Sequence, residues 1–332
     1  MCLLNPEIDR LRRRRLSLRR TQVDSTKKAL GEPPCSAEYH SLAVPFSPHK
    51  PAITPRDIAI LRDLWLLRYL TTKQISRLHF GHLKLAQRRL RVLTARRFVQ
   101  RFRPAEAAQS GFGIWWYRLA REGAELVADA EDLTAKKVLP PTRHPSTMGF
   151  LAHHALLTDF RIWLREACQA SAGDFGYRFI PAYEEVRGER SRRIALSLGG
   201  HSRALVPDGV FALKRSDGKQ ALFVIEVDRG TEPLTGRHRS SITGKFRRYC
   251  EAFDSRAEQK YGELLGSNFN GFRILCVVPS ERRQAAFLRL AQKTDLEPLV
   301  WVTKHSVLES PGRLDTKCWV TSPEEELHSL AE

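Results

Sequence analysis

The chain has 332 residues and a formal net charge of +18, from 55 Lys and Arg against 37 Asp and Glu. Its 42% hydrophobic content supplies a substantial core, so a purely disordered basic protein is excluded, and the charge favours a polyanionic partner. Apolar stretches are far shorter than the roughly 20 residues of a membrane span, and charged residues begin at Glu7, so we expect a cytoplasmic protein, neither exported nor membrane-spanning. The six cysteines form no CxxC pair, which favours reduced thiols over disulfides or a zinc site.

The positive charge is concentrated in the first part of the chain. Residues 1–50 contribute +5, residues 51–130 contribute +9 and residues 131–332 only +4. Because residues 1–50 combine the arginine block Arg12–Arg15 with several prolines and little periodicity, we expect a disordered basic arm that contacts phosphates without sequence preference. The alternative is a solvated helix that contacts nothing.

A helix-turn-helix pattern follows the arm. Thr54 is suited to cap a helix and Pro55 to occupy its first position, and apolar residues then recur at helical spacing. We expect a short break at 70–72, a second helix at 73–80, and a third helix from about 83 to 95 with Leu85, Leu90 and Leu93 facing inward.

The other face of the third helix is basic. Long cationic and amide side chains on one side of a helix are what contact with phosphates and base edges requires. Extended segments at 98–102 and 113–119 then resemble a β-hairpin wing, which predicts a winged-helix DNA-binding domain at residues 51–132. The alternative is an ordinary three-helix bundle with a solvated basic face. The candidate DNA-binding residues are Lys84, Gln87, Arg88, Arg91, Arg96, Arg97 and, on the hairpin, Arg101.

The second half of the chain alternates helices and strands. The order α-β-β-β-α-β-α-β predicts an α/β domain with a mixed sheet at residues 148–305, followed by a C-terminal tail at 306–332. The expected helices are 148–170, 241–254 and 281–292, and the expected strands are 177–186, 210–213, 221–228, 272–278 and 299–303.

Acidic residues end the strand at 221–228. Alternation places Glu226 and Asp228 on one face of this apolar strand, and Asp208 on the neighbouring strand adds a third carboxylate. Because like charges this close repel each other, a buried acidic cluster is costly unless a cation lies within it. The sequence therefore predicts Mg²⁺ or Mn²⁺ there, with Asp208, Glu226 and Asp228 as ligands.

The helix after this strand carries a lysine at the edge of its apolar stripe. Lys245 lies three residues after Ile242 and four before Tyr249, so it shares their side of the helix. Its ammonium group either reaches back to the acidic cluster or extends to solvent, which is the commoner arrangement.

This arrangement resembles a known nuclease superfamily. Pro207-Asp208 followed by Glu226-Val227-Asp228 resembles the PD-(D/E)XK nucleases, and the preceding winged helix makes residues 53–305 similar to the plasmid replication-relaxation family. The resemblance implies that Asp208 and Glu226 bind metal and that a lysine orients or activates the attacking water. Asp228 occupies the position of that lysine. Either Lys245 replaces the missing cation, or the site binds metal without cutting well.

Several further residues are candidates for the same site, each with a solvated or packing role as the alternative. His153 and His154 point about 100° apart on a helix, so they cannot both join one site. The other candidates are Glu166 and Glu185 as additional acidic residues, Arg229, Arg237, His238 and Arg239 as phosphate contacts, and Thr231 and Glu232 on a loop over the site.

Two functions of different classes are compatible with these features. The first is a DNA-binding protein of a plasmid or other mobile element, involved in replication, relaxation or mobilisation, that hydrolyses phosphodiesters through Asp208, Glu226, Asp228 and Lys245. The second is a non-catalytic DNA-binding regulator with a degenerate nuclease fold, which Asp228 in place of lysine keeps open. DNA is the expected partner, and a second copy of the chain or partner replication and mobilisation proteins are further candidates.

Overall fold

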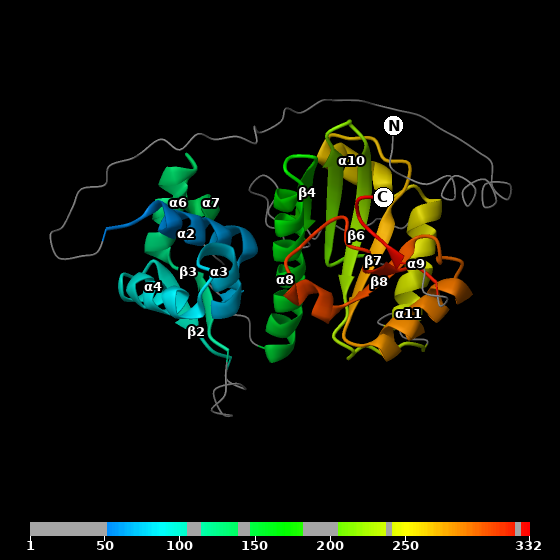
Figure 1. The fold of residues 1–332 in the computed structure, drawn as a ribbon, viewed down its shortest axis with the longest axis horizontal. Coiled ribbons are helices and arrows are strands. Elements are labelled where there is room, and N and C mark those ends of the chain that lie inside the picture. The colour runs from blue at the N-terminus through cyan, green and yellow to red at the C-terminus, as the bar shows by residue number, and fades with distance from the viewer. Residues whose placement is uncertain (1–51, 105–113, 139–146, 182–204, 237–240, 323–326) are drawn as a thin grey trace. The chain divides into compact units, whose positions relative to one another are not determined.

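A computed structural model describes residues 52–104, 114–138, 147–181, 205–236, 241–322 and 327–332 (Figure 1). These residues form two compact units: an N-terminal unit, up to Thr147, and a C-terminal unit, from Met148 onward. The basic arm expected at residues 1–50 lies outside the described ranges. None of the helices within these ranges combines the length and the apolar character that crossing a membrane requires.

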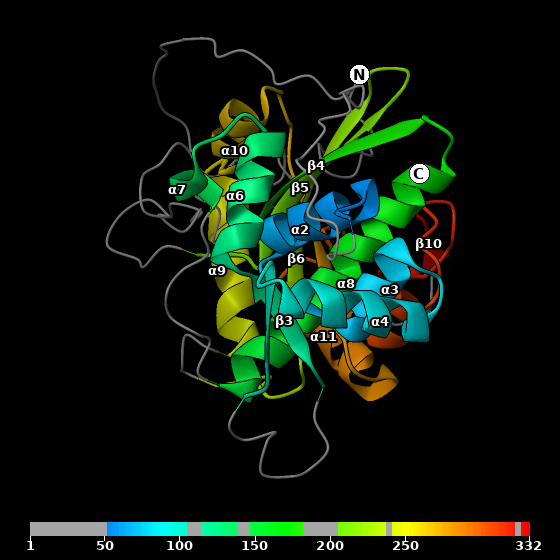
Figure 2. The same cartoon turned by 90° about the vertical axis from the view of Figure 1, so that its left-hand side faces the viewer.

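The N-terminal unit combines helices with a small antiparallel sheet of order β1-β3-β2. Two of the expected helices begin with capping boxes, one from Thr54 and Asp57 and the other from Thr71 and Gln74. Figure 2 shows α2, α3, α4 and α6 of this unit together with β3. The elements are α2 (Pro55–Leu67), β1 (Leu70–Thr71), α3 (Thr72–His79), α4 (Leu83–Ala95), β2 (Val99–Phe102), β3 (Trp116–Leu119), α6 (Arg121–Ala130) and α7 (Ala135–Val138).

Two details of this unit differ from the sequence prediction. The expected break at 70–72 contains the short strand β1, which pairs with β3. The phase of α4 also differs: Leu85 is 46% exposed, so its predicted inward orientation is wrong, whereas Leu90 and Leu93 are buried as predicted. Ala86 fills the inward position because residues 86, 90 and 93 follow the i, i+4, i+7 spacing of one helix face.

The C-terminal unit contains a seven-stranded sheet of order β10-β9-β8-β7-β6-β5-β4. The central strands β6, β7 and β8 are parallel and the other pairs are antiparallel, so the unit is α/β with a mixed sheet. Helix α8 covers one face, and α9 and α11 cover the other (Figure 1). The elements are α8 (Met148–Ala170), β4 (Phe175–Pro181), β5 (Gly209–Arg215), β6 (Gln220–Val227), α9 (Ile242–Asp254), α10 (Glu258–Leu265), β7 (Arg273–Val278), α11 (Glu281–Lys293), β8 (Val300–Lys304), η1 (His305–Glu309), β9 (Trp319–Val320) and β10 (Leu327–His328).

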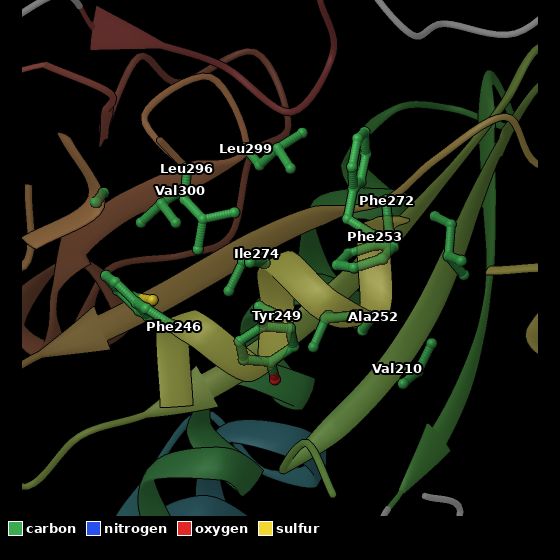
Figure 3. Packing of buried hydrophobic residues seen from close by; sticks show 14 of the residues in the cluster. Val210, Phe246, Tyr249, Ala252, Phe253, Phe272, Ile274, Leu296, Leu299 and Val300 are labelled. Atoms are coloured by element: carbon green, nitrogen blue, oxygen red, sulfur yellow. The ribbon is translucent and has the colours of Figure 1, made fainter. Parts of the chain in front are cut away.

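The two faces of β6 belong to different hydrophobic cores. Val224 packs in the cluster that contains Phe246 of α9, and Figure 3 shows Phe246 beside Tyr249 and Ile274 in that cluster. Ile225 faces the opposite way and packs in the cluster that contains Phe160 of α8. The alternation predicted for this strand is therefore present, and it directs Glu226 toward the side of the sheet that α9 covers.

The residues after 305 contradict the prediction of a C-terminal tail. Strands β9 and β10 extend the sheet, and Trp319 and Leu330 are only 1% and 4% exposed in the core next to α8. Gly312 approaches α8 so closely that a Cβ atom at this position would lie 1.8 Å from the carbonyl oxygen of Trp163. The segment is part of the folded unit because its apolar side chains complete a core that α8 and the sheet leave open. The helix α10, which precedes β7, was not predicted either.

Candidate functional site

Two acidic residues meet where β5 begins and β6 ends. In the antiparallel register Gly209 pairs with Ile225, so the next position along places Asp208 opposite Glu226. Asp208 immediately precedes the first residue of β5, so its side chain lies at the strand end next to Glu226 and is not confined to one face of the sheet. One Asp208 oxygen, Oδ2, also accepts a hydrogen bond of 2.8 Å from the backbone N–H of Val227. The register therefore holds the two carboxylates together.

Helix α9 supplies two side chains to Glu226. Lys245 Nζ lies 2.9 Å from Glu226 Oε2, and the hydroxyl of the buried Tyr249 donates to Glu226 Oε1. Figure 3 shows the Tyr249 ring inside the core with its hydroxyl at the end of the stick. Lys245 Nζ also lies 3.6 Å from Glu232 Oε2, on the loop after β6. Of the two arrangements considered for Lys245, the structure has the one that reaches the acidic cluster.

The opposite face of the sheet supplies a histidine. His153 near the start of α8 places Nε2 at 3.0 Å from Asp208 Oδ1. His154 points elsewhere and stacks on Phe150, with ring centroids 6.0 Å apart. Only one of the two histidines therefore joins the site, as the helical spacing required. Two helices on opposite faces of the sheet thus contribute to one site because Asp208 and Glu226 lie at the strand ends.

Burial and charge shift the pKa values in this group. Burial would raise the pKa of Asp208, but His153 and Lys245 outweigh this effect and lower it. Burial would lower the pKa of His153, but the hydrogen bond with Asp208 raises it above 6.5. Burial raises the pKa of Glu226. Burial opposes the charge of Lys245 too, but the carboxylates around it, Glu226 first among them, raise its pKa. Lys245 is therefore a fixed cation at neutral pH and not a base.

Asp228 forms an ion pair of its own. Both of its carboxylate oxygens accept from Arg283 of α11, over 2.6 Å and 3.0 Å, and the same guanidinium donates to the backbone oxygen of Glu232 over 2.6 Å. This bidentate contact satisfies Asp228 without a metal and anchors the loop that follows β6. Arg283 was missed in the sequence because nothing in the pattern of α11 distinguishes it from its neighbours.

Protein donors reach every carboxylate oxygen of Asp208, Glu226 and Asp228. Both oxygens of Asp208, Glu226 and Asp228 have a partner within hydrogen-bonding distance. Among the described residues, no group of three or more His, Cys, Asp and Glu side chains is placed to hold a metal ion. The cations that offset the buried acidic charge in the structure are those of Lys245 and Arg283.

The remaining candidates for this site differ in their positions. Glu166 accepts a hydrogen bond of 3.1 Å from the backbone N–H of Gly312, so it ties α8 to the segment before β9. Arg229 lies beside Gly149 of α8, and Thr231 precedes Glu232 on the loop next to Lys245. The candidates outside the described residues are Glu185, Arg237, His238 and Arg239.

The N-terminal unit presents a basic helix face. Lys84, Gln87, Arg88 and Arg91 of α4 are all exposed. Arg89 points the other way and pairs with the buried Asp57. Of the remaining candidates, Arg97 and Arg101 are exposed, and Arg96 is half-buried over the ring of Phe98, 4.7 Å from its centroid.

Comparison with known proteins places the chain in a family. The family model described as replication-relaxation matches residues 61–265, a range that includes most of the N-terminal unit and extends through α10 of the C-terminal unit. Comparisons with curated proteins and with solved structures gave no match. Because the matched range is more than half of the chain, and the sequence resembles the same family, the protein belongs to the replication-relaxation family.

Proposed function

We propose that this protein binds the DNA of a plasmid or other mobile element during its replication, relaxation or mobilisation, and that its C-terminal unit hydrolyses a phosphodiester bond of that DNA. The N-terminal unit is then a winged-helix domain at residues 51–132. The C-terminal unit is a PD-(D/E)XK nuclease-like domain that begins at residue 148. Membership of the replication-relaxation family supports the role in mobile-element DNA.

DNA binding by the N-terminal unit is supported by the position of its exposed charges. Helix α4 is the third of the described helices of the unit, and its exposed side carries the cations that contact with phosphates requires. The β2–β3 hairpin follows it directly, in the place of a wing. Lys84, Arg88 and Arg91 have no carboxylate partner within the described part of the chain, so their charges are available to an anion.

The cross-strand pair of Asp208 and Glu226, with Lys245 bonded to it, carries the proposal of hydrolysis. Mg²⁺ characteristically takes only one or two protein carboxylates and completes its shell with water and phosphate oxygens. Asp208 and Glu226 fit this donor set and would hold Mg²⁺ or Mn²⁺ through the second lone pair of oxygens that each accept one hydrogen bond, whereas one guanidinium, that of Arg283, holds both Asp228 oxygens. Such an ion supplies Lewis-acid neutralisation of phosphate charge and a more acidic bound water.

The protein groups have separate roles in this proposal. Lys245 stays protonated beside Glu226, so it adds a fixed positive charge where the charge of a reacting phosphate increases. Tyr249 orients the Glu226 carboxylate by donating to Oε1 from a buried position. His153 orients Asp208 from the other face of the sheet. Asp228 occupies the sequence position of the lysine in the PD-(D/E)XK pattern, and Lys245 supplies the positive charge of that lysine from α9.

A non-catalytic DNA-binding regulator is the second candidate. The observation that favours it is the complete pairing of the acidic oxygens with protein donors, which stabilises the charges with no ion present. In that case the C-terminal unit has a structural role on the DNA, and the site is a polar network that holds α8 and α9 to the sheet.

Incubation of supercoiled plasmid with Mg²⁺ or Mn²⁺ separates the two candidates. We expect wild type to produce open circles, and Asp208→Asn and Glu226→Gln each to slow this by about 100-fold. Asp217→Asn, in the turn at the other end of β5, is the matched control and keeps full activity. Unchanged plasmid with tight, salt-sensitive binding by wild type supports the regulator instead. Equal cleavage by wild type and both site variants rules out this site.

A further inference from the structure

The β2–β3 hairpin carries two arginines stacked on one tryptophan. The guanidinium carbon of Arg101 lies 3.9 Å from the centroid of the Trp115 ring, and that of Arg103 lies 3.8 Å from it. Two planar groups at these distances would overlap on one face of the ring, so they lie on opposite faces. The indole is thus enclosed between two cations.

The strand register creates this arrangement. Phe102 pairs with Trp116, so one position further along Arg103 lies opposite Trp115, and Arg101 is its diagonal neighbour on the same face. Arg101 is exposed, whereas Arg103 and Trp115 are half-buried. Arg103 Nε is buried without a hydrogen-bond partner, so stacking, and not hydrogen bonding through Nε, positions this guanidinium.

The stack has no anion of its own among the described residues. No carboxylate there pairs with Arg101 or Arg103, although the two cations repel each other across a single ring. Stacking also uses only the faces of the guanidinium groups, so within the described residues their terminal N–H donors remain for a ligand. Two donor edges separated by one ring fit a ligand with two neighbouring anionic groups.

We propose that Arg101, Trp115 and Arg103 form a preorganised clamp for two neighbouring backbone phosphates of duplex DNA. This inference rests on the proposed DNA binding and assigns a specific role to the hairpin. Trp115 contacts no DNA in this role: it restricts the rotamers of both arginines before binding, so less side-chain freedom is lost on contact. The clamp reads charge and not sequence, because phosphates are the same at every base pair.

The test measures duplex binding by the full chain at several salt concentrations, using fluorescence anisotropy. Log affinity falls as log salt rises, so the slope is negative. Replacing a phosphate-binding arginine makes this slope less steep by about one. We expect this for Arg101→Gln and for Arg103→Gln, and little change for Arg121→Gln, an exposed arginine of α6 paired with Glu125. Trp115→Leu changes no charge, yet it should weaken binding by about three- to tenfold and make the slope less steep.

Trp115→Phe retains an aromatic face and should recover part of the affinity lost in Trp115→Leu, and melting curves of both variants verify that they are folded. If Trp115→Leu is destabilised, the affinities and salt slopes of Trp115→Phe, Arg101→Gln and Arg103→Gln test the clamp in its place. Binding by a folded Trp115→Leu variant at the wild-type affinity and slope overturns the clamp.

Two duplexes distinguish the ligand. If Arg101→Gln and Arg103→Gln lose equal affinity for an A-tract duplex and for a G·C-rich duplex, contact with phosphates is supported. A loss confined to the A-tract duplex contradicts it, since a narrow minor groove would then be the ligand. Wild type that shows no salt-dependent duplex binding overturns the proposed DNA binding and the clamp together.

Discussion

Asp57 of α2 and Arg89 of α4 form a bidentate ion pair in the N-terminal unit, and the carboxylate of this pair is fully buried. Arg89 Nε donates to Asp57 Oδ1 over 2.6 Å, and Arg89 Nη2 donates to Oδ2. The same Oδ2 accepts from the backbone N–H of Thr54 over 2.7 Å, so one carboxylate both caps α2 and holds α4. The pair helps to fix the rotation of α4 about its axis, and with it the set of side chains that the helix exposes.

Loss of Arg89 should destabilise the protein. Arg89→Met leaves Asp57 buried, with 0% exposure and without its cation, and we expect the free energy of unfolding to fall by about 3 kcal/mol. Arg88→Met, the exposed neighbour on the same helix, is the control and should change it by less than about 0.5 kcal/mol. Urea denaturation followed by circular dichroism measures both. Equal effects of the two substitutions would show that the ion pair does not stabilise the fold.

The same ion pair should make the stability of the fold depend on pH. Burial would raise the pKa of Asp57, but Arg89 and Thr54 outweigh it and hold the pKa below 3.8. A carboxyl group with a lowered pKa stabilises the fold fully above its unfolded value and loses this contribution as the pH falls through its folded value. The melting temperature of wild type should therefore approach that of Asp57→Asn as the pH falls below 3.8. A difference that stays constant over this range contradicts the prediction.

Lys245 and Glu226 should be strongly coupled. Lys245→Met leaves a carboxylate that is only 6% exposed without its cation, and we expect a loss of about 3 kcal/mol. Glu226→Gln in the same chain removes the orphaned charge and keeps an acceptor for Tyr249, so the double variant should regain at least about 1 kcal/mol. A double-mutant cycle of urea denaturation measures this coupling. Additive losses would mean that the contact contributes nothing.

The pairing of Asp228 with Arg283 predicts the effect of restoring the lysine of the nuclease pattern. Asp228→Lys places two cations together where the structure has a bidentate pair, and we expect the melting temperature to fall by several degrees. A second substitution, Arg283→Glu, should recover most of the loss by reversing the pair. Arg282→Glu, one position earlier on α11 and exposed, is the control that should not recover it. If Arg283→Glu and Arg282→Glu restore the melting temperature equally, the pairing of Asp228 with Arg283 is not specific.

The helices and strands that the sequence predicted best are those with strong local signals. Thr54 and Pro55 define the start of α2, and the periodicity at 148–170 gives the bounds of α8. Local signals are weaker where tertiary contact decides. Leu85 satisfies a helical apolar pattern, yet the core selects the face that contains Ala86. Strands β9 and β10 have only two residues each, and two residues are too few to show the alternation of apolar and polar positions that predicts a strand.

The candidate site was predictable to the extent that it depends on local geometry. Strand alternation placed Glu226 and Asp228 on one face of their strand, and helical spacing placed Lys245 and Tyr249 on one side of the following helix. The partners of the other two acids depend on long-range packing. Arg283 is 55 residues from Asp228 in the sequence, and His153 reaches Asp208 from a helix on the other face of the sheet. No periodicity in a single segment contains such information.

The burial of Trp319 and Leu330 also bears on the synthesis of the protein. Both side chains complete the core on which α8 packs, although α8 is the first of the described elements of the C-terminal unit. A ribosome delivers α8 long before it delivers these residues, so part of the apolar side of α8 has no native partner until translation of residues 319–330. The N-terminal unit has its described core within residues 60–138 and can fold earlier. The basic face of α4 can therefore form on the nascent chain before the residues of the acidic site are complete.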